Sequence, residues 1–166
     1  MKKYFSFLIA LSMSVMAFAQ QDAPASVPVG TVAPEIALPT LNGDIVKLSD
    51  MKGKVVVVDF WASWCGDCRR ETPAVIELYN EYHAKGVEFL GVSFDSDAEK
   101  MKAAIEKYKM PWPQVTELKA WKETEINKAY EIKWIPAFYV ICPEGKVLAY
   151  ATTAEDLKAA LAKIIQ

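Results

Sequence analysis

The chain has 166 residues, of which 52% are hydrophobic and 24% are charged, and its formal net charge is -2. This length suggests one domain, which can bury a core large enough to fold without disulfides. No basic stripe or block of like charges is present, which argues against binding to nucleic acid or to an anionic membrane surface.

Residues 1–19 have the pattern of an export signal. Lys2 and Lys3 precede an uncharged, mostly apolar run over residues 4–18, and Ala17 and Ala19 are small residues at the positions that a signal peptidase reads. The run is shorter than the roughly 18 residues of a membrane-spanning helix. We therefore expect cleavage after Ala19 and a periplasmic protein, with an uncleaved membrane anchor as the alternative.

The next segments are predicted to be a lead, a hairpin and two strands. Residues 20–30 contain Pro24 and Pro28, which predicts a flexible lead before a single domain over residues 31–166. Residues 35–48 are expected to form a β-hairpin with Asn42-Gly43 at its turn. The β-branched run over residues 55–60 predicts a central strand buried on both faces, and residues 88–94 predict the next strand.

Helices are predicted between and after these strands. One follows the first buried strand and ends at Gly86, because apolar residues recur before it at helical spacing. A second, around residues 101–108, is expected to begin with a capping box of Ser96 and Glu99 and to stop before Pro111. Residues 121–130 predict a weaker helix, residues 137–141 and 146–151 an antiparallel strand pair, and the C-terminal residues a last helix. This order predicts an α/β fold with a mixed sheet.

Cys65 and Cys68 lie between the predicted central strand and the helix that follows, so Cys65 is expected at the helix N-terminus. Thiolate is the reactive form of cysteine, and a helix N-terminus favours negative charge. A free cysteine is only about 3% ionised at pH 7, and half ionisation requires roughly 2 kcal/mol. The helix dipole supplies about 0.3–1 kcal/mol, so hydrogen bonds to the sulfur must supply the rest. The spacing allows Cys68 to resolve a mixed disulfide on Cys65.

Two other interpretations of this cysteine pair are open. A zinc half-site would need further ligands, and only Cys142 and His83 are available. A passive staple would close so short a loop that it gains little stability. We expect no metal and no other cofactor.

Three residues elsewhere are weighed in the same way. Cys142 is interpreted as a small residue at a strand end, with a third redox thiol as the alternative. His83, near a helix end, is interpreted as a surface residue. Trp112, between two prolines, is expected to pack in the core, with binding of a partner as the alternative.

Residues 59–68, Asp-Phe-Trp-Ala-Ser-Trp-Cys-Gly-Asp-Cys, resemble the active-site segment of thioredoxins. Residues 29–68 are similar to the exported TlpA/ResA-like branch, through Gly-Thr-Val-Ala-Pro at 30–34, Leu-Ser-Asp at 48–50 and Gly-Lys at 53–54. The similarity continues through Ile-Pro-Ala-Phe at 135–138 and Pro-Glu-Gly-Lys at 143–146. It implies a thioredoxin-like three-layer fold, with a mixed central sheet flanked by helices and an N-terminal β-hairpin.

The resemblance also implies the roles of four residues. Cys65 would be the nucleophile and Cys68 the resolving thiol. Pro136 matches a proline that the family holds in the cis form beside the active site. Ile135, which precedes it, would offer its backbone to a substrate strand.

Acidic and aromatic residues complete the implied site. Asp59, in a valine-rich strand, should have a pKa raised by desolvation and take the proton of the resolving thiol, unless it reaches solvent at the strand end. Glu71 matches an acid that could tune the same thiol, and its alternative is a solvated first-turn glutamate. Trp64 is expected to shield the thiols or to pack in the core. Contacts with the substrate are also implied for Gly66 and Asp67.

Two residues depart from the family pattern. Asp67 stands where the family often has proline, and a charge beside the thiols can alter the redox potential. Asp59 is typical of thioredoxins, whereas ResA-like members often carry asparagine there, which weakens a transfer of the cytochrome-maturation role.

These observations predict a monomeric thiol–disulfide oxidoreductase. The resemblance implies exported protein disulfides or thiols as substrates, apocytochrome c among the candidates, and a membrane electron donor. The sequence does not fix the direction of electron flow. The alternatives are a thiol peroxidase of the peroxiredoxin type and a redox-inert binding domain with a stapled helix.

Overall fold

A five-stranded sheet runs through the middle of the computed structural model, which describes residues 27–165. The strand order is β5 (Gln114–Thr116), β4 (Glu88–Ser93), β3 (Val56–Trp61), β6 (Ala137–Ile141) and β7 (Val147–Ala151). Strands β3, β4 and β5 are parallel, whereas β6 and β7 each run antiparallel to their neighbours. The expected mixed sheet is confirmed.

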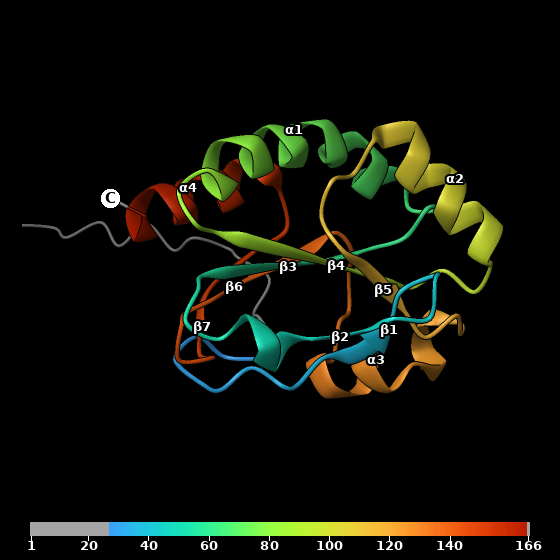
Figure 1. The fold of residues 1–166 in the computed structure, drawn as a ribbon, viewed down its shortest axis with the longest axis horizontal. Coiled ribbons are helices and arrows are strands. Elements are labelled where there is room, and N and C mark those ends of the chain that lie inside the picture. The colour runs from blue at the N-terminus through green and yellow to red at the C-terminus, as the bar shows by residue number, and fades with distance from the viewer. Residues whose placement is uncertain (1–26, 166) are drawn as a thin grey trace, which may run out of the picture.

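Helices cover both faces of this sheet (Figure 1). The helices α1 (Gly66–His83), α2 (Ala98–Tyr108) and α4 (Ala154–Ile164) lie on one face, and α3 (Glu125–Tyr130) lies on the other. The fold is therefore the three-layer, thioredoxin-like arrangement that the sequence predicts.

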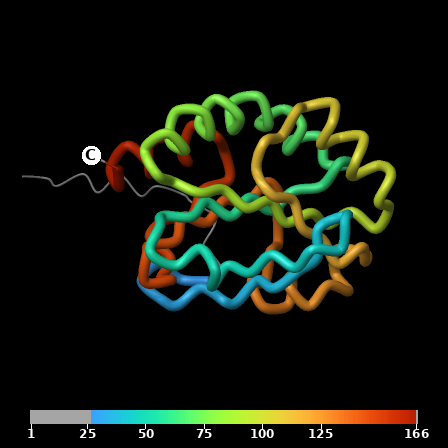
Figure 2. The backbone as a smooth tube through the Cα atoms, viewed as in Figure 1, coloured from blue at the N-terminus to red at the C-terminus, as the bar shows by residue number. Residues whose placement is uncertain are grey.

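The predicted N-terminal hairpin lies on the same side of the sheet as α3 (Figure 2). Strand β1 (Ala37–Pro39) pairs antiparallel with β2 (Ile45–Lys47). The turn is longer than a two-residue Asn-Gly turn, because the N–H of Thr40 donates to the carbonyl of Asp44 at 2.8 Å. Gly43 has a φ of 92°, a left-handed conformation that glycine adopts without steric cost. A 3-10 helix, Leu48–Met51, follows the hairpin.

The side chains of β3 alternate between the two layers, which decides where Asp59 points. Phe89 of β4 packs against Tyr79 of α1, with 5.4 Å between ring centroids. Phe89 is the register partner of Val57, so Val57 faces α1 as well. Asp59 lies two residues further along β3 and therefore also points toward α1.

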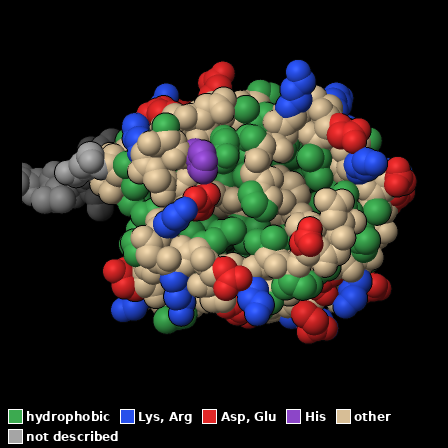
Figure 3. Space-filling view, in the orientation of Figure 1, with side chains coloured by type: hydrophobic (Ala, Val, Ile, Leu, Met, Phe, Trp, Pro, Cys, Tyr) green, Lys and Arg blue, Asp and Glu red, His purple; other side chains and the backbone are tan. Residues whose placement is uncertain are grey.

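Two further positions agree with the sequence analysis. Trp112 is buried and lies 5.7 Å from the ring of Phe89, so core packing is confirmed. His83 ends α1 with an exposed side chain. On the face shown in Figure 3, charged side chains of both signs are spread around the rim, and apolar side chains gather between the two outer layers.

Three features differ from the predictions. Asp97, and not Ser96, caps α2, because its Oδ1 accepts hydrogen bonds from the N–H groups of Glu99 and Lys100 at 3.0 and 3.2 Å. The backbone is still extended at Asp97, so α2 begins one residue later than a cap at Ser96 predicts. The helix predicted over residues 121–130 is split into a 3-10 helix, Trp121–Glu123, and α3, which Thr124 caps. Strand β5 was missed because three residues show no periodicity.

The N-terminal end of the described part packs onto the domain. Val27 is buried, and the N–H of Gly30 donates to the carbonyl of Val147 in β7 at 2.8 Å. These residues belong to the predicted lead, so its last part lies against the sheet. The predicted export signal and cleavage site lie outside the described residues. Over residues 27–165, no helix has the length and apolar character needed to cross a membrane.

Candidate active site

Cys65 is the N-cap residue of α1, as the sequence predicts, and it forms a disulfide with Cys68. The Sγ of Cys65 accepts a hydrogen bond from the backbone N–H of Cys68 at 3.0 Å. Both cysteines are buried, with 7% and 3% of their surface exposed. The first turn of α1 therefore points a backbone donor at the sulfur of Cys65, and a donor in this position favours the charged form of a cysteine.

The segment before β6 lies directly against this sulfur. The Ile135–Pro136 peptide bond is cis, which confirms the expectation drawn from the resemblance. The carbonyl oxygen of Ile135 lies 3.5 Å from the Sγ of Cys65. The backbone of Ile135 is thus next to the sulfur that the resemblance assigns as the nucleophile.

A surface hollow opens beside the disulfide. The residues that line it come from three segments: Trp64, Cys65, Gly66, Asp67, Trp121, Trp134 and Ile135. Trp64 and Trp134 have 53% and 59% of their surface exposed, so core packing of Trp64 is excluded. Trp64 instead rests on Trp121, with 5.9 Å between ring centroids. Exposed apolar surface of this kind is a common feature of binding sites for ligands and partner chains.

Trp121 and Trp134 were not found from the sequence. Trp134 stands directly before the Ile-Pro pair, and that position was the available signal. Trp121 reaches the hollow only through the fold, because it stacks on Phe94 at 5.5 Å and its Nε1 donates to Oδ1 of Asn127 at 2.8 Å. No local sequence pattern predicts that Trp121 lies beside the hollow.

The charged residue of the active-site turn, Asp67, forms an ion pair with Arg70 on the surface of α1. Both side chains are exposed, and exposed pairs of this kind contribute little stability. The carboxylate that replaces the family's proline is therefore partly compensated by a neighbouring cation.

Asp59 is a buried acid on the α1 face of the sheet, the face on which Cys68 is also buried. Only 4% of its surface is exposed, so the alternative of a solvated strand-end acid is wrong. Desolvation raises the pKa of Asp59 to about 7. Within residues 27–165 no hydrogen bond or ion pair offsets this burial. A carboxyl group with such a pKa can both take up and release a proton near neutral pH.

Glu71 is engaged elsewhere. Its Oε2 accepts a hydrogen bond of 2.7 Å from the N–H of Ala154, the first residue of α4. The carboxylate thus satisfies one of the free N–H groups at the start of α4 and joins α1 to α4. This contact favours a structural role over tuning of Cys68, and Glu71 is not simply solvated.

Asp95, which sequence reasoning missed, holds the turn that precedes the cysteines. Its Oδ2 accepts hydrogen bonds from the N–H of Ser63 and the Oγ of Ser93, both at 2.8 Å, and its Oδ1 accepts from the Oγ of Ser63 at 2.6 Å. Asp95 is almost fully buried, so these bonds satisfy the carboxylate. The turn carrying Trp64 and Cys65 is thereby anchored to the end of β4.

Cys142 lies at the opposite end of the sheet from the disulfide. It follows β6 directly, and the last residue of β6, Ile141, pairs with Val56 at the start of β3. Cys65 lies beyond the other end of β3. A strand of six residues spans about 17–20 Å. The Cys142 thiol therefore cannot exchange with the disulfide of its own molecule.

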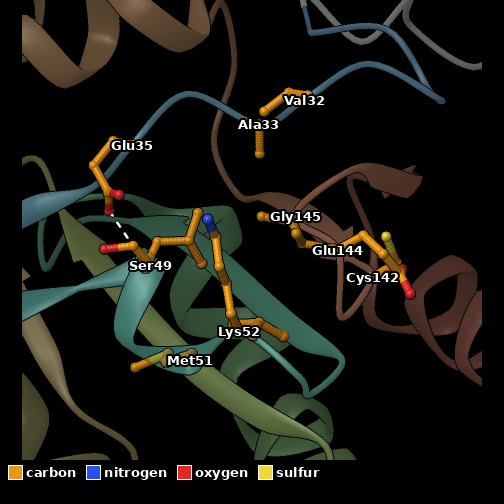
Figure 4. Close-up of a pocket in the computed structure, with 12 residues that line it drawn as sticks. Val32, Ala33, Glu35, Ser49, Met51, Lys52, Cys142, Glu144 and Gly145 are labelled. Carbon is orange, nitrogen blue, oxygen red and sulfur yellow. Dashed lines mark hydrogen bonds between the residues drawn. The ribbon is translucent and has the colours of Figure 1, made fainter.

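A second cavity lies at that far end (Figure 4). Glu35 and Ser49 border it from the N-terminal segment and the first 3-10 helix, where the N–H of Ser49 donates to Oε1 of Glu35 at 3.1 Å. Glu144 and Cys142 border it from the turn between β6 and β7. Over residues 27–165, three or more His, Cys, Asp or Glu side chains nowhere gather in a metal-binding arrangement.

Comparison with known proteins places this site in a family. The model of the AhpC/TSA family matches residues 29–150. The thiol-disulfide oxidoreductase ResA of Bacillus cereus is 32% identical over 139 residues, which cover 82% of this chain and 78% of that protein. ResA of Oceanobacillus iheyensis is 35% identical over 123 residues. The match covers 72% of this chain and 62% of that protein.

Solved structures agree in fold and in name. The thioredoxin domain of a thiol-disulfide oxidoreductase from Bacteroides vulgatus matches with a TM-score of 0.77 and 38% identity, over 84% of this chain and 99% of that one. A thiol:disulfide interchange protein from Bacteroides sp. matches with a TM-score of 0.75 and 38% identity, over 84% and 91% of the two chains.

The relatives are named thiol-disulfide oxidoreductases, and thiol–disulfide exchange requires a pair of cysteines that can form and open a disulfide. Cys65 and Cys68 provide that pair at the start of α1. The protein is therefore an enzyme of thiol–disulfide exchange, and the comparisons give no support to a peroxidase or an inert binding domain. The chain belongs to the AhpC/TSA family, in which its relatives are the ResA-like thiol–disulfide oxidoreductases of thioredoxin fold.

Proposed function

We propose that this protein reduces disulfides of exported proteins through the Cys65–Cys68 pair. The observation that carries the proposal is the position of Cys65. Its sulfur accepts a hydrogen bond from the N–H of Cys68 at the N-terminus of α1 and lies against the carbonyl of Ile135. Cys65 also lines an open hollow.

The energetics of the Cys65 thiolate support its role as the nucleophile. Half ionisation at pH 7 requires roughly 2 kcal/mol relative to a free cysteine. The helix dipole contributes about 0.3–1 kcal/mol, and a hydrogen bond to a charged group contributes about 1.5–3 kcal/mol. The dipole and the single bond from the Cys68 N–H together cover the requirement.

In the first step the Cys65 thiolate attacks a disulfide of the substrate. A bond forms between Cys65 and one substrate sulfur, and the other substrate sulfur leaves as a thiolate. We propose that the substrate segment lies along the backbone at Ile135 and Pro136 and fills the hollow between Trp64 and Trp134. Apolar surface beside the sulfur suits a polypeptide better than a small charged disulfide.

In the second step the Cys68 thiol loses its proton and attacks Cys65. The Cys65–Cys68 disulfide forms and the substrate leaves as a dithiol, so two electrons pass from the protein to the substrate. We propose that Asp59 takes the proton of Cys68. Its burial on the same face of the sheet and its pKa of about 7 support this role.

The direction and the cellular setting belong to the same proposal. Residues 1–19 have the composition of an export signal, and disulfides persist outside the cytosol. A reductase there must be reduced again, for which we propose a membrane electron donor. Apocytochrome c is one candidate substrate.

Reduction of insulin by dithiothreitol, with and without the mature protein, tests the activity. We expect turnover with the intact protein, none with Cys65→Ser, and a trapped mixed disulfide with Cys68→Ser. Peroxide consumption in place of insulin reduction would support a thiol peroxidase. A reduction potential of about −270 mV supports a reductase, whereas one of about −120 mV would reverse the proposed direction. Cell fractionation and the mass of the mature chain test export and cleavage after Ala19.

A further inference from the structure

Gln114, Gly91 and Asp59 form one lateral row across three neighbouring strands. Gly91 of β4 is the register partner of Asp59 in β3 and of Gln114 in β5. Register partners in adjacent strands share a face of the sheet, so all three residues face α1. The only residue between the glutamine and the acid in this row is a glycine, which has no side chain.

The side chain of Gln114 occupies the space above Gly91. A Cβ on Gly91 would lie 2.0 Å from Oε1, 2.5 Å from Cδ and 2.7 Å from Nε2 of Gln114. Glycine is therefore required at this position for the glutamine to lie along the row toward β3. Nε2 of Gln114 thus lies close to the Cβ position of Gly91, and Asp59 is the next residue of the row, about 5 Å away across one strand spacing.

The orientation of the Gln114 amide is fixed by chemistry. The Nε1–H of Trp61 donates to Oε1 of Gln114 at 2.8 Å. An indole N–H can only donate, so the oxygen faces Trp61 and the nitrogen faces elsewhere. The Nε2 is buried and has no hydrogen-bond partner among residues 27–165. A buried amide donor without an acceptor costs stability unless a water or an ionised group satisfies it.

We propose that Gln114 is a positioning residue for the exchange reaction: its Nε2 stabilises the ionised carboxylate of Asp59 through one bridging water molecule. This inference rests on the proposed role of Asp59 as the proton acceptor of Cys68. Nε2 has no direct hydrogen-bond partner among the described residues, and a water molecule between it and the carboxylate would have the two polar partners that a buried water needs. A donor to the carboxylate favours its charged form, which keeps part of Asp59 ionised at neutral pH.

The other groups around Asp59 do not supply this donor. Its register partners on β4 and β6 are Gly91 and Phe138, which have no polar side-chain atoms. Among the described residues that α1, α2 and α4 bury, Cys68 and Tyr82 are the titratable ones. Beyond β4, the carboxylate of Asp95 is held by serines and is an acceptor. Two buried donors without a partner remain among the described residues, Nε1 of Trp112 and Nε2 of Gln114. Gln114 is the one in the row that contains Asp59, because Gly91 pairs with both.

An NMR titration of the oxidised full-length protein tests the inference, because Cys68 does not titrate in the disulfide. Gln114→Met keeps the length of the side chain and removes the amide. We expect the midpoint of the Asp59 carboxyl signal to rise by about one pH unit, the size of one hydrogen bond to a charged group. Asn127→Leu is the matched control, because it removes the amide acceptor of another indole, Trp121, on the opposite face. Its Asp59 midpoint should equal that of the wild type.

A second measurement needs no change at Gln114 and so does not depend on the folding of that variant. In the wild type, the side-chain N–H signals of Gln114 should shift with the same midpoint as Asp59 and become independent of pH in Asp59→Asn. The inference would be overturned if Gln114→Met left the midpoint of Asp59 unchanged. It would also be overturned if the N–H signals of Gln114 did not shift as Asp59 titrates. The rate of insulin reduction tests the proposed function separately. Full turnover by Asp59→Asn would show that Asp59 is not the base. The titration midpoints test only the coupling between Asp59 and Gln114.

Discussion

The carbonyl oxygen of Ile135 lies 3.5 Å from the Sγ of Cys65, although the two residues are 70 positions apart. The sheet produces this contact. Phe60 near the end of β3 pairs with Ala137 at the start of antiparallel β6, so the loop that leaves β3 meets the loop that enters β6. The pairing of β3 with β6 thereby brings the sulfur of Cys65 and the backbone of Ile135 together, and Asp95 anchors the turn that carries Cys65.

Asp59→Asn should remove a pH dependence from the stability of the protein. The folded pKa is raised from 3.8 to about 7, so between these pH values the folded state holds a proton that the unfolded state has released. The free energy of unfolding therefore falls as pH rises through this window, by at most about 4 kcal/mol, and is level above it. Urea unfolding of both proteins at about pH 4.5 and about pH 8, near the two ends of this window, measures the difference. Equal pH dependence of the two proteins would show that Asp59 titrates normally.

Trp64→Ala and Trp134→Ala should weaken the reduction of peptide disulfides. Each variant removes an exposed apolar surface beside Cys65. We expect the KM for a disulfide peptide with bulky apolar residues to rise about tenfold, which corresponds to about 1.4 kcal/mol of lost apolar contact. The rate with a small aromatic disulfide should change little. Ile45→Ala removes a similarly exposed side chain on β2 and serves as the control. Equal losses for peptide and small disulfide would mean that the tryptophans do not hold the substrate.

The elements that were predicted correctly are those that a short stretch of sequence determines. The valine run of β3, the helical periodicity of α1 and the position of Cys65 between them are all local, and the structure confirms them. The cap of α2 was misplaced by one residue because Ser96 and Asp97 are both good caps, and only the backbone decides between them.

The residues that sequence reasoning missed act over long distances in the chain. Asp95 reaches Ser63 across 32 positions and Trp61 reaches Gln114 across 53. Both contacts exist because β3, β4 and β5 are neighbours, and no short window shows that pairing. Glu71 was interpreted from its match to an acid of the ResA-like proteins, whereas the packing of α4 on α1 gives it another partner.

Asp95→Ala should destabilise the fold and loosen the turn before Cys65. The change leaves the N–H of Ser63 and the hydroxyls of Ser63 and Ser93 without their buried acceptor. We expect a loss of about 3 kcal/mol in the free energy of unfolding, measured with urea. Asp97→Ala removes an exposed cap of α2 and should cost clearly less. A loss no larger than that of Asp97→Ala would refute the anchoring role.

Glu71→Ala should lower stability and leave thiol chemistry unchanged. The N–H of Ala154 loses its acceptor, and we expect a loss of about 1 kcal/mol, as for a helix cap. Glu71→Gln keeps an oxygen acceptor and should retain most of the stability. A shifted pH profile of Cys68 alkylation in Glu71→Gln would instead support direct tuning of the thiol.

The acidity of the Cys65 thiol is the claim on which the account depends. It is measured by alkylation of the reduced protein with iodoacetamide across pH, in a Cys142→Ser background so that only Cys65 and Cys68 react. We predict that Cys65 is modified first, with a midpoint clearly below that of a free cysteine, because the N–H of Cys68 and the start of α1 favour its thiolate. A midpoint near about 8.5 for both cysteines would contradict the account.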